Sequence, residues 1–223
     1  NSAPSLRLLH EQLTCAMTSN GLSYEIIFVD DGSRDDSWSI VKTLAATDPL
    51  VSGIRMARNF GQHNALLCGI RAARHEVVVT IDDDLQNPPE EILRLLKKLD
   101  DGFDVVYGTP RKQQHGLMRG LASAVTKFSL QGMMGSTEAR HASAFRAFFT
   151  RLRDAFHGFE SSFVSVDVLL TWGAGRFGHV EVDHRPRQAG RSGYTVGKLV
   201  RHAINMLTGY TTWPLQAASL LGF

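Results

Sequence analysis

Apolar residues in the first half of the chain switch between helical spacing and short β-branched runs. Leu6, Leu8, Leu9, Leu13 and Met17 predict a helix that ends at Asn20-Gly21. Four apolar runs predict strands at residues 24–29, 51–56, 76–80 and 104–108, and helices are predicted between them at 37–46, 62–73 and 90–99. This repeated order predicts an α/β fold, a Rossmann-like and mostly parallel sheet with helices on both faces.

The second half of the chain is less regular. A polar segment at 109–116, which carries Arg111 and Lys112, predicts a loop over the site. The later patterns predict a helix at 117–131, irregular chain at 132–141, a strand at 142–149, a helix at 162–172, an edge strand at 176–183, a basic loop at 184–194 and a last helix at 195–210. The apolar stripe of that last helix fits either a core-facing helix or an interfacial helix near anionic lipid headgroups.

A cluster of carboxylates follows the strand at 76–80, in the turn formed by residues 81–89. In an extended segment Asp82 and Asp84 project to one side and Asp83 to the other. Carboxylates at the carboxyl end of a strand suit a hard divalent cation, and capping the next helix would require only one of them. We therefore expect the outer pair to hold Mg²⁺ or Mn²⁺ and assign Asp83 to substrate contact.

A second acidic turn follows the strand at 24–29. Asp30, Asp31 and Ser33 could cap the next helix, or they could accept hydrogen bonds from ribose hydroxyls and a base N–H, and we favour the ligand. Further along, Arg58 near Gly61 at a predicted helix start fits a phosphate contact. His63 is interpreted as a hydrogen-bonded turn residue.

Composition adds a few constraints. The chain has 223 residues, 43% of them hydrophobic, and a net charge of +2, which fits one sizeable α/β domain and gives no reason to expect nucleic acid as a partner. Cys15 and Cys68 are predicted to be buried thiols in a reducing compartment. The sequence shows no signal peptide and no run of eighteen apolar residues, and both of its ends look cut, as in a fragment of a longer protein.

Four motifs together resemble those of family 2 glycosyltransferases of the GT-A fold. They are Val29-Asp30-Asp31-Gly32-Ser33-Arg34-Asp35, Asn59-Phe60-Gly61-Gln62-His63, an Asp-x-Asp-x-Gln-x-Pro-Pro pattern from Asp82 and an Arg-x-x-Gly-x-Ser-x-Tyr pattern from Arg187. The closest resemblance within that family is to the polyprenyl-phosphate glycosyltransferases. It covers nearly the whole chain and implies one GT-A domain over 1–223, with a nucleotide- and metal-binding half at about 1–108, an acceptor-side half at about 109–193, and an amphipathic helix and apolar tail at 194–223.

The resemblance also implies roles for single residues. It assigns the metal to Asp82, Asp84 and Gln86, and the nucleoside to Asp30 or Asp31. Two departures are a missing first strand, of which Asn1 would be the last residue, and Arg140 in place of an acidic residue. It also implies that Ser143, Phe145 and Arg146 line the donor and acceptor site, and that Arg187, Gly190, Ser192 and Tyr194 lie in a loop that closes over phosphates. The residues implied to be catalytic are Asp84, Arg146 and Arg187.

The activity implied is transfer of one sugar from a nucleotide diphosphate sugar, UDP favoured over GDP, to a polyprenyl phosphate at the cytoplasmic face of a membrane, with inversion. An ionised acceptor phosphate would need no general base. Two alternatives stay open, a family 2 transferase acting on a saccharide hydroxyl and a non-catalytic membrane-associated scaffold. Ser192 after Gln188-x-x-Arg191, in place of Trp, argues against a processive synthase, and Leu85 argues against an Asp-x-Asp phosphohydrolase.

Overall fold

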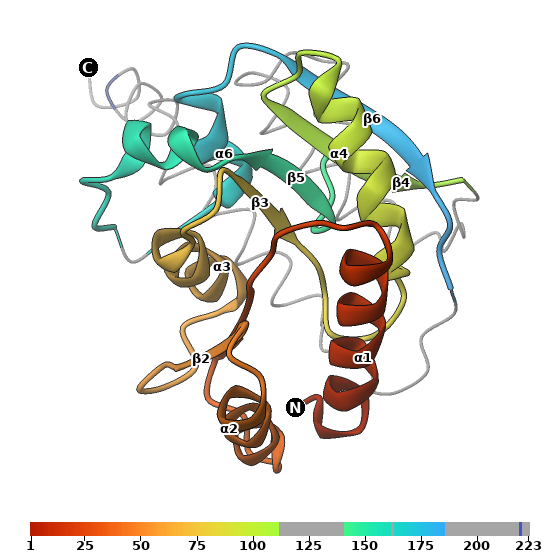
Figure 1. Ribbon diagram of the computed structural model, residues 1–223. Coiled ribbons are helices and arrows are strands. Elements are labelled where there is room, and N and C mark those ends of the chain that lie inside the picture. The colour runs from red at the N-terminus through yellow and green to blue at the C-terminus, as the bar shows by residue number, and fades with distance from the viewer. Residues whose placement is uncertain (112–140, 162, 186–218, 220–223) are drawn as a thin grey trace, which may run out of the picture.

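The computed structural model describes residues 1–111, 141–161, 163–185 and 219 (Figure 1). The predicted helix at 117–131, most of the basic loop and the last helix lie outside these residues. The helices are α1 (Ala3–Ser19), α2 (Ser37–Thr47), α3 (Gln62–Ala72), α4 (Ile92–Asp100) and α6 (Val166–Thr171), with 3-10 segments η1 (Pro89–Glu91) and η3 (Thr150–Phe156). The strands are β1 (Ile26–Asp30), β2 (Val51–Arg55), β3 (Val77–Thr80), β4 (Val105–Pro110), β5 (Arg146–Phe149) and β6 (Phe177–Val182).

The strands form two sheets. β1 pairs with β2 in parallel, and the second sheet has the order β3-β5-β4-β6. β4 and β6 are parallel, whereas β5 is antiparallel to both β3 and β4, because β5 starts with Arg146 opposite Thr80, the last residue of β3. The α/β class and the edge position of the strand at 176–183 are confirmed, and the sheet is mixed at β5.

A hollow of about 1060 Å³ separates β1 from β3. It is lined by every residue of both strands and by side chains of α1, α3 and α4, so it runs the length of the two facing strand edges. In the part of the chain that the structure describes, no residue pairs with these edges.

Helices cover both faces of the second sheet (Figure 1). On one face, α4 packs against β4, β5 and β6. α1 packs beside η1, and α2 covers β1 and β2, and all three helices share a core that includes Leu9, Val41, Leu95 and Val106. On the other face, α3, η3 and α6 enclose a second core. Burial of these apolar side chains is the main stabilising contribution, at about 25 cal/mol per Å² of apolar surface. Both cores leave the carboxyl ends of β1 and β3 at one edge of the molecule.

Some sequence-based predictions need correction. α6 has six residues and β5 four, so both are shorter than predicted. Leu8 is 39% exposed, since it lies outside the buried stripe of α1. Cys15 is exposed on the same helix and is not a buried thiol. None of the helices in the described ranges combines the length and the apolar character that a membrane span needs.

Candidate active site

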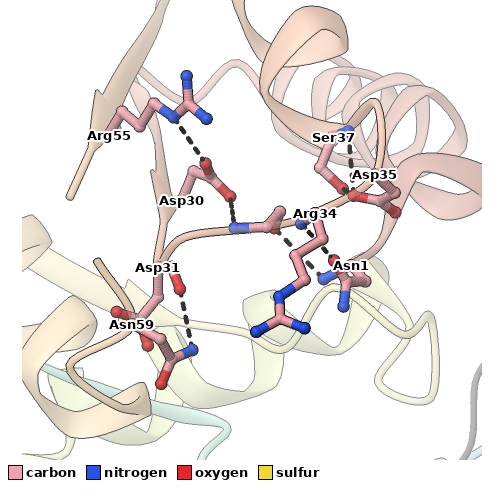
Figure 2. Close-up of polar contacts among 9 residues, drawn as sticks. Asn1, Asp30, Asp31, Arg34, Asp35, Ser37, Arg55 and Asn59 are labelled. Carbon is pink, nitrogen blue, oxygen red and sulfur yellow. Dashed lines mark hydrogen bonds and ion pairs between the residues drawn. The ribbon is translucent and has the colours of Figure 1, made fainter. Parts of the chain in front are cut away.

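Asp30 ends β1 and is one of the few buried carboxylates in the described chain, with 6% of its surface exposed. Its Oδ1 accepts a hydrogen bond from the Ser33 backbone N–H at 3.1 Å. Its Oδ2 is buried without a hydrogen bond and lies 3.5 Å from Arg55 Nε (Figure 2). A buried acceptor normally has a donor partner, and the nearest cation to this oxygen is the Arg55 guanidinium.

Asp31 has a different environment. Both of its carboxylate oxygens accept backbone N–H groups, from Phe60 at 2.7 Å and from Gly61 at 2.8 Å. Its carbonyl accepts the Asn59 side-chain amide at 2.9 Å (Figure 2). Asp31 therefore holds the loop before α3 against the turn after β1, and of the two predicted nucleoside carboxylates only Asp30 has a buried oxygen without a hydrogen bond.

The alternative role of this turn is to cap α2, whose N-cap residue is Asp36, but the carboxylate that contacts the start of the helix is Asp35. Its Oδ1 accepts the Ser37 hydroxyl at 2.6 Å and the Ser37 backbone N–H at 3.2 Å. Burial alone raises the pKa of Asp35, but donation from Ser37 and from the Ala3 backbone N–H lowers that pKa below its ordinary value. Asp30 and Asp31 are thus not needed at the helix start.

The two loops border a hollow of about 730 Å³. Arg58 is exposed on its rim, with its guanidinium 4.7 Å from the centre of the Phe60 ring. An exposed cation beside an open hollow is able to contact a phosphate. The lining consists of Asn1, Gly32, Ser33, Arg34, Arg55, Met56, Ala57, Arg58 and Asn59.

None of the three aspartates in the acidic turn after β3 is as buried as Asp30. Asp82 and Asp84 are half-buried, and Asp83 between them is exposed. Gln62, the first residue of α3, donates its side-chain amide to Asp82 Oδ1 at 2.8 Å. Asp84 Oδ1 accepts the Gln86 backbone N–H at 3.1 Å. Gln62 therefore links the acidic turn to the helix that Asp31 holds.

Leu85 adopts a left-handed conformation with φ +60°. This conformation is uncommon for a residue with a bulky side chain. The Leu85 side chain is 4% exposed and belongs to the main core, which offsets the backbone cost. Leu85 therefore anchors the turn between Asp84 and Gln86 from below.

The end of β6 leads back to this turn. Arg185 donates its backbone N–H to the Gln86 carbonyl at 2.8 Å, and Gln86 Nε2 donates to the Arg185 carbonyl at 3.5 Å. His184 Nδ1 lies 3.3 Å from Asn87 Oδ1. The chain therefore reaches the acidic turn two residues before Arg187.

The side chains of this turn suit a hard cation in their chemistry, since two carboxylates and an amide offer only oxygen ligands. Among the residues that the structure describes, no three His, Cys, Asp or Glu side chains are grouped for a metal ion. Mg²⁺ sites use one or two carboxylates and complete their coordination with water and substrate phosphates. Asp82, Asp84 and Gln86 fit such a partial site.

The remaining predicted residues divide into two groups. Ser143 is half-buried, and its Oγ accepts the Phe145 backbone N–H at 3.2 Å. Arg146 is only 1% exposed and forms an ion pair with Asp167, so its side chain is not presented at a surface. The residues that lie outside the described ranges are Arg140, Arg187, Gly190, Ser192 and Tyr194.

Sequence reasoning missed three residues of this region: Arg55, Gln62 and Asp167. Arg55 ends the strand next to β1 and reaches Asp30. Gln62 lies in the Asn59-Phe60-Gly61-Gln62-His63 motif, but its contact with Asp82 joins positions 20 residues apart, which a local pattern does not reveal. Asp167 interrupts an apolar run, which was the available signal for a buried charged residue.

Comparison with known proteins gives the family. A model of glycosyl transferase family 2 matches residues 3–154. The chain belongs to glycosyl transferase family 2. This family 2 glycosyltransferase is 34% identical to the undecaprenyl-phosphate 4-deoxy-4-formamido-L-arabinose transferase of Salmonella paratyphi A. The alignment covers 100% of this chain and 68% of the relative. The enzyme of that name from Serratia proteamaculans is also 34% identical, with the same coverage.

Solved structures share the fold of this family 2 glycosyltransferase. Glucosyl-3-phosphoglycerate synthase from Mycobacterium tuberculosis, in complex with Mn²⁺, UDP-glucose and phosphoglyceric acid, superposes with a TM-score of 0.59 at 20% identity, covering 89% of this chain and 73% of its own. A mannosyltransferase from Pyrobaculum calidifontis, in complex with GDP-mannose and Mn²⁺, has a TM-score of 0.53 at 22% identity, covering 83% and 54%. These similarities confirm the GT-A fold.

Proposed function

We propose that the protein transfers one sugar from a nucleotide diphosphate sugar to a polyprenyl phosphate, with a divalent cation at the acidic turn after β3. One observation carries the proposal: Asp31 and Asp82 both contact the first turn of α3, through Gly61 and Gln62, so the two acidic turns lie at one edge of the molecule. In open α/β sheets, ligands bind at that edge. The names of the two relatives support the lipid acceptor.

The nucleoside would bind on the β1 side. Asp30 Oδ2 would accept a base N–H or a ribose hydroxyl, and Arg58 and Ser33 on the border of the 730 Å³ hollow would contact phosphate or ribose. A uracil and a guanine both offer N–H donors. We favour UDP because several structural neighbours contain it, and one neighbour contains GDP-mannose.

The diphosphate would lie between the two acidic turns. A divalent cation held by Asp82, Asp84 and Gln86 would supply Lewis-acid stabilisation of the departing diphosphate. Arg58 and, as a prediction outside the described residues, Arg187 would neutralise the same developing charge. Asp83, the most exposed of the three aspartates, would contact substrate.

The acceptor needs little activation by the chain. A phosphate monoester has a second pKa near 6, so it is already a nucleophilic anion at neutral pH and needs no general base. Ser143, at the entry to β5, would line the acceptor side, and Gly190, Ser192 and Tyr194 would close over phosphates. We propose one displacement with inversion, at the cytoplasmic face of a membrane where the lipid phosphate is presented.

The test uses the full-length protein in membranes that contain undecaprenyl phosphate. Radiolabelled UDP-glucose, GDP-mannose and the UDP derivative of 4-deoxy-4-formamido-L-arabinose are supplied in parallel, with Mg²⁺ or with EDTA. We expect label in the extractable lipid from one donor, only with the metal. Label in a saccharide instead would move the acceptor to a hydroxyl. Nucleotide binding without transfer from any of these donors would contradict the proposal and favour the scaffold.

A further inference from the structure

A buried charged cluster lies beneath the site, on the face of the sheet covered by α6. Arg146 of β5 is 1% exposed, Tyr107 of β4 is fully buried, and Asp167 of α6 is 9% exposed. Arg146 Nη1 and the Tyr107 hydroxyl both donate to Asp167 Oδ1, the latter at 3.0 Å. We refer to these three residues as the Arg146 cluster.

The Arg146 cluster is not explained by stability alone. Arg146 Nε is buried and has no hydrogen-bond partner, so the guanidinium is incompletely satisfied. A buried ion pair often contributes no more stability than apolar side chains of the same size, because desolvation offsets the attraction. The two hydrogen bonds to Asp167 Oδ1 do, however, join β4, β5 and α6 at one atom, so they constrain the relative positions of these three elements.

Two chains of contacts connect the Arg146 cluster to the acidic turn. In the first, Arg146 lies opposite Thr80, the last residue of β3, and the Thr80 hydroxyl donates to the Ala144 carbonyl at 2.5 Å. Asp82 follows two residues after Thr80. The first route therefore joins the start of β5, where Ser143 lies, to the strand that carries Asp82.

The second route passes through α6 and α3. The backbone N–H of Val166, next to Asp167, donates to His63 Nδ1 at 3.3 Å. Gln62, next to His63, donates to Asp82 Oδ1 at 2.8 Å. Both routes thus end at Asp82, one through the sheet and one through the helices.

We infer that Asp167 and Tyr107 are positioning residues for the transfer reaction. They hold Arg146, and with it the start of β5 and of α6, in one arrangement against the end of β3, which sets the position of Asp82. Arg146 acts from beneath the site and does not contact substrate, which revises the direct catalytic role expected from sequence. The inference rests on the proposed function, because it assigns the Arg146 cluster to the metal turn of that reaction.

The test compares two variants that each lose one buried hydroxyl. Tyr107→Phe removes the hydrogen bond to Asp167 and keeps the ring. Thr150→Val, the matched control, removes the hydrogen bond to the His75 carbonyl at the other end of β5, at 2.5 Å. Asp167→Asn is a third variant, which removes the charge. For each, kcat, the donor KM, the melting temperature and the EPR spectrum of bound Mn²⁺ with UDP are measured.

We expect Tyr107→Phe to lower kcat about 10-fold and Asp167→Asn about 100-fold, since small misplacements of a reacting geometry have effects of this size. The donor KM should stay within about 2-fold, because the nucleoside contacts are remote from the Arg146 cluster. Thr150→Val should lower the melting temperature by about as much as Tyr107→Phe does, because each loses one buried hydrogen bond, but its kcat should stay within about 2-fold of wild type. The Mn²⁺ spectrum should change in Tyr107→Phe and not in Thr150→Val.

The inference is overturned if Tyr107→Phe and Thr150→Val have the same effect on kcat and leave the Mn²⁺ spectrum unchanged, because the Arg146 cluster would then be purely structural. If Asp167→Asn does not fold, the comparison of the two hydroxyl variants still decides. A wild-type protein that binds Mn²⁺ and UDP but transfers no sugar refutes the proposed function instead, and the spectra still test the positioning role.

Discussion

The two acidic turns occupy equivalent places, each at the carboxyl end of a strand, yet the protein uses their carboxylates differently. After β1, each carboxylate oxygen of Asp31 accepts one backbone N–H, and Asp30 is buried, with one oxygen that has no hydrogen bond and lies 3.5 Å from Arg55 Nε. After β3, Asp82 and Asp84 are half-buried; Asp82 accepts the Gln62 side-chain amide and Asp84 accepts the Gln86 backbone N–H. We call the first turn, which Asp31 ties to the loop before α3, the closed turn, and the second, in which Asp83 is exposed, the open turn.

This difference is consistent with the two kinds of ligand that we propose for the turns. A base edge is recognised by a buried acceptor in a fixed position. A base that leaves this acceptor without a donor incurs the cost of an unpaired buried polar group, so the acceptor discriminates between bases. A hydrated cation instead needs several accessible oxygens that tolerate water and phosphate as further ligands. In the proposed function, similar sequences, Asp-Asp-Gly and Asp-Asp-Asp, would thus serve specificity in one turn and charge neutralisation in the other. Three predictions test this comparison, and a fourth concerns a carboxylate outside both turns.

The largest effect is expected from Asp84→Asn in the open turn. Loss of one carboxylate from the metal should lower transfer at least about 1000-fold, since Lewis-acid stabilisation contributes several kcal/mol and each 1.4 kcal/mol is tenfold in rate. The melting temperature should not change, because Asp84 is not part of a core. Asp101→Asn, a remote surface carboxylate that pairs with Lys98, is the matched control. Normal transfer with normal metal dependence in Asp84→Asn would disprove the metal assignment.

In the closed turn, Asp30→Asn should weaken nucleotide binding about 10-fold to 30-fold, the loss expected for one hydrogen bond to a charged group. Isothermal titration with UDP and with GDP measures this effect and identifies the preferred base. Wild-type affinity for both nucleotides would remove Asp30 from the nucleoside site.

The rigidity of the closed turn is tested at Gly32. Its φ is +74°, and an added Cβ would lie 2.9 Å from the Asn59 backbone nitrogen. Gly32→Ala should therefore lower the free energy of unfolding by about 2–3 kcal/mol, from backbone strain and from a contact that the two loops cannot relieve.

Gly21→Ala separates these two contributions. Gly21 has a φ of +63° but no atom within 4 Å of an added Cβ. Strain alone should cost about 1 kcal/mol there. Equal losses in the two variants, measured by urea denaturation, would show that the approach of the two loops is not tight.

The smallest effect is a pH dependence remote from both turns. The His10 side chain donates to Asp48, as does the Leu50 backbone N–H, and despite some burial the pKa of Asp48 is held below its ordinary value. Because the folded pKa is the lower one, this contribution is complete above the unfolded pKa, near 4, and is lost as the pH falls through the folded pKa. Asp48→Asn should therefore flatten the fall in urea midpoint below pH 4. An identical pH dependence in both proteins would exclude Asp48 as its source.

Much of this architecture follows from local patterns. The helical spacing of Leu6, Leu9 and Leu13 and the β-branched run at Val77–Thr80 predicted α1 and β3, because each element must bury one face or both. The sequence also placed both acidic turns at strand ends, and the match to family 2 confirms the class of enzyme that their motifs resemble. The metal and substrate assignments themselves remain proposals.

Only the tertiary structure decided how individual charges are used. Asp30 and Asp31 are neighbours in sequence, but distant backbone groups at Phe60 and Gly61 saturate one of them and not the other. Arg146 looked like a site residue, and its burial depends on Tyr107 and Asp167, which lie 39 positions before it and 21 after it. Periodicity reports which face of one element is buried. The partners of a polar side chain depend on which elements pack together, and no local pattern contains that information.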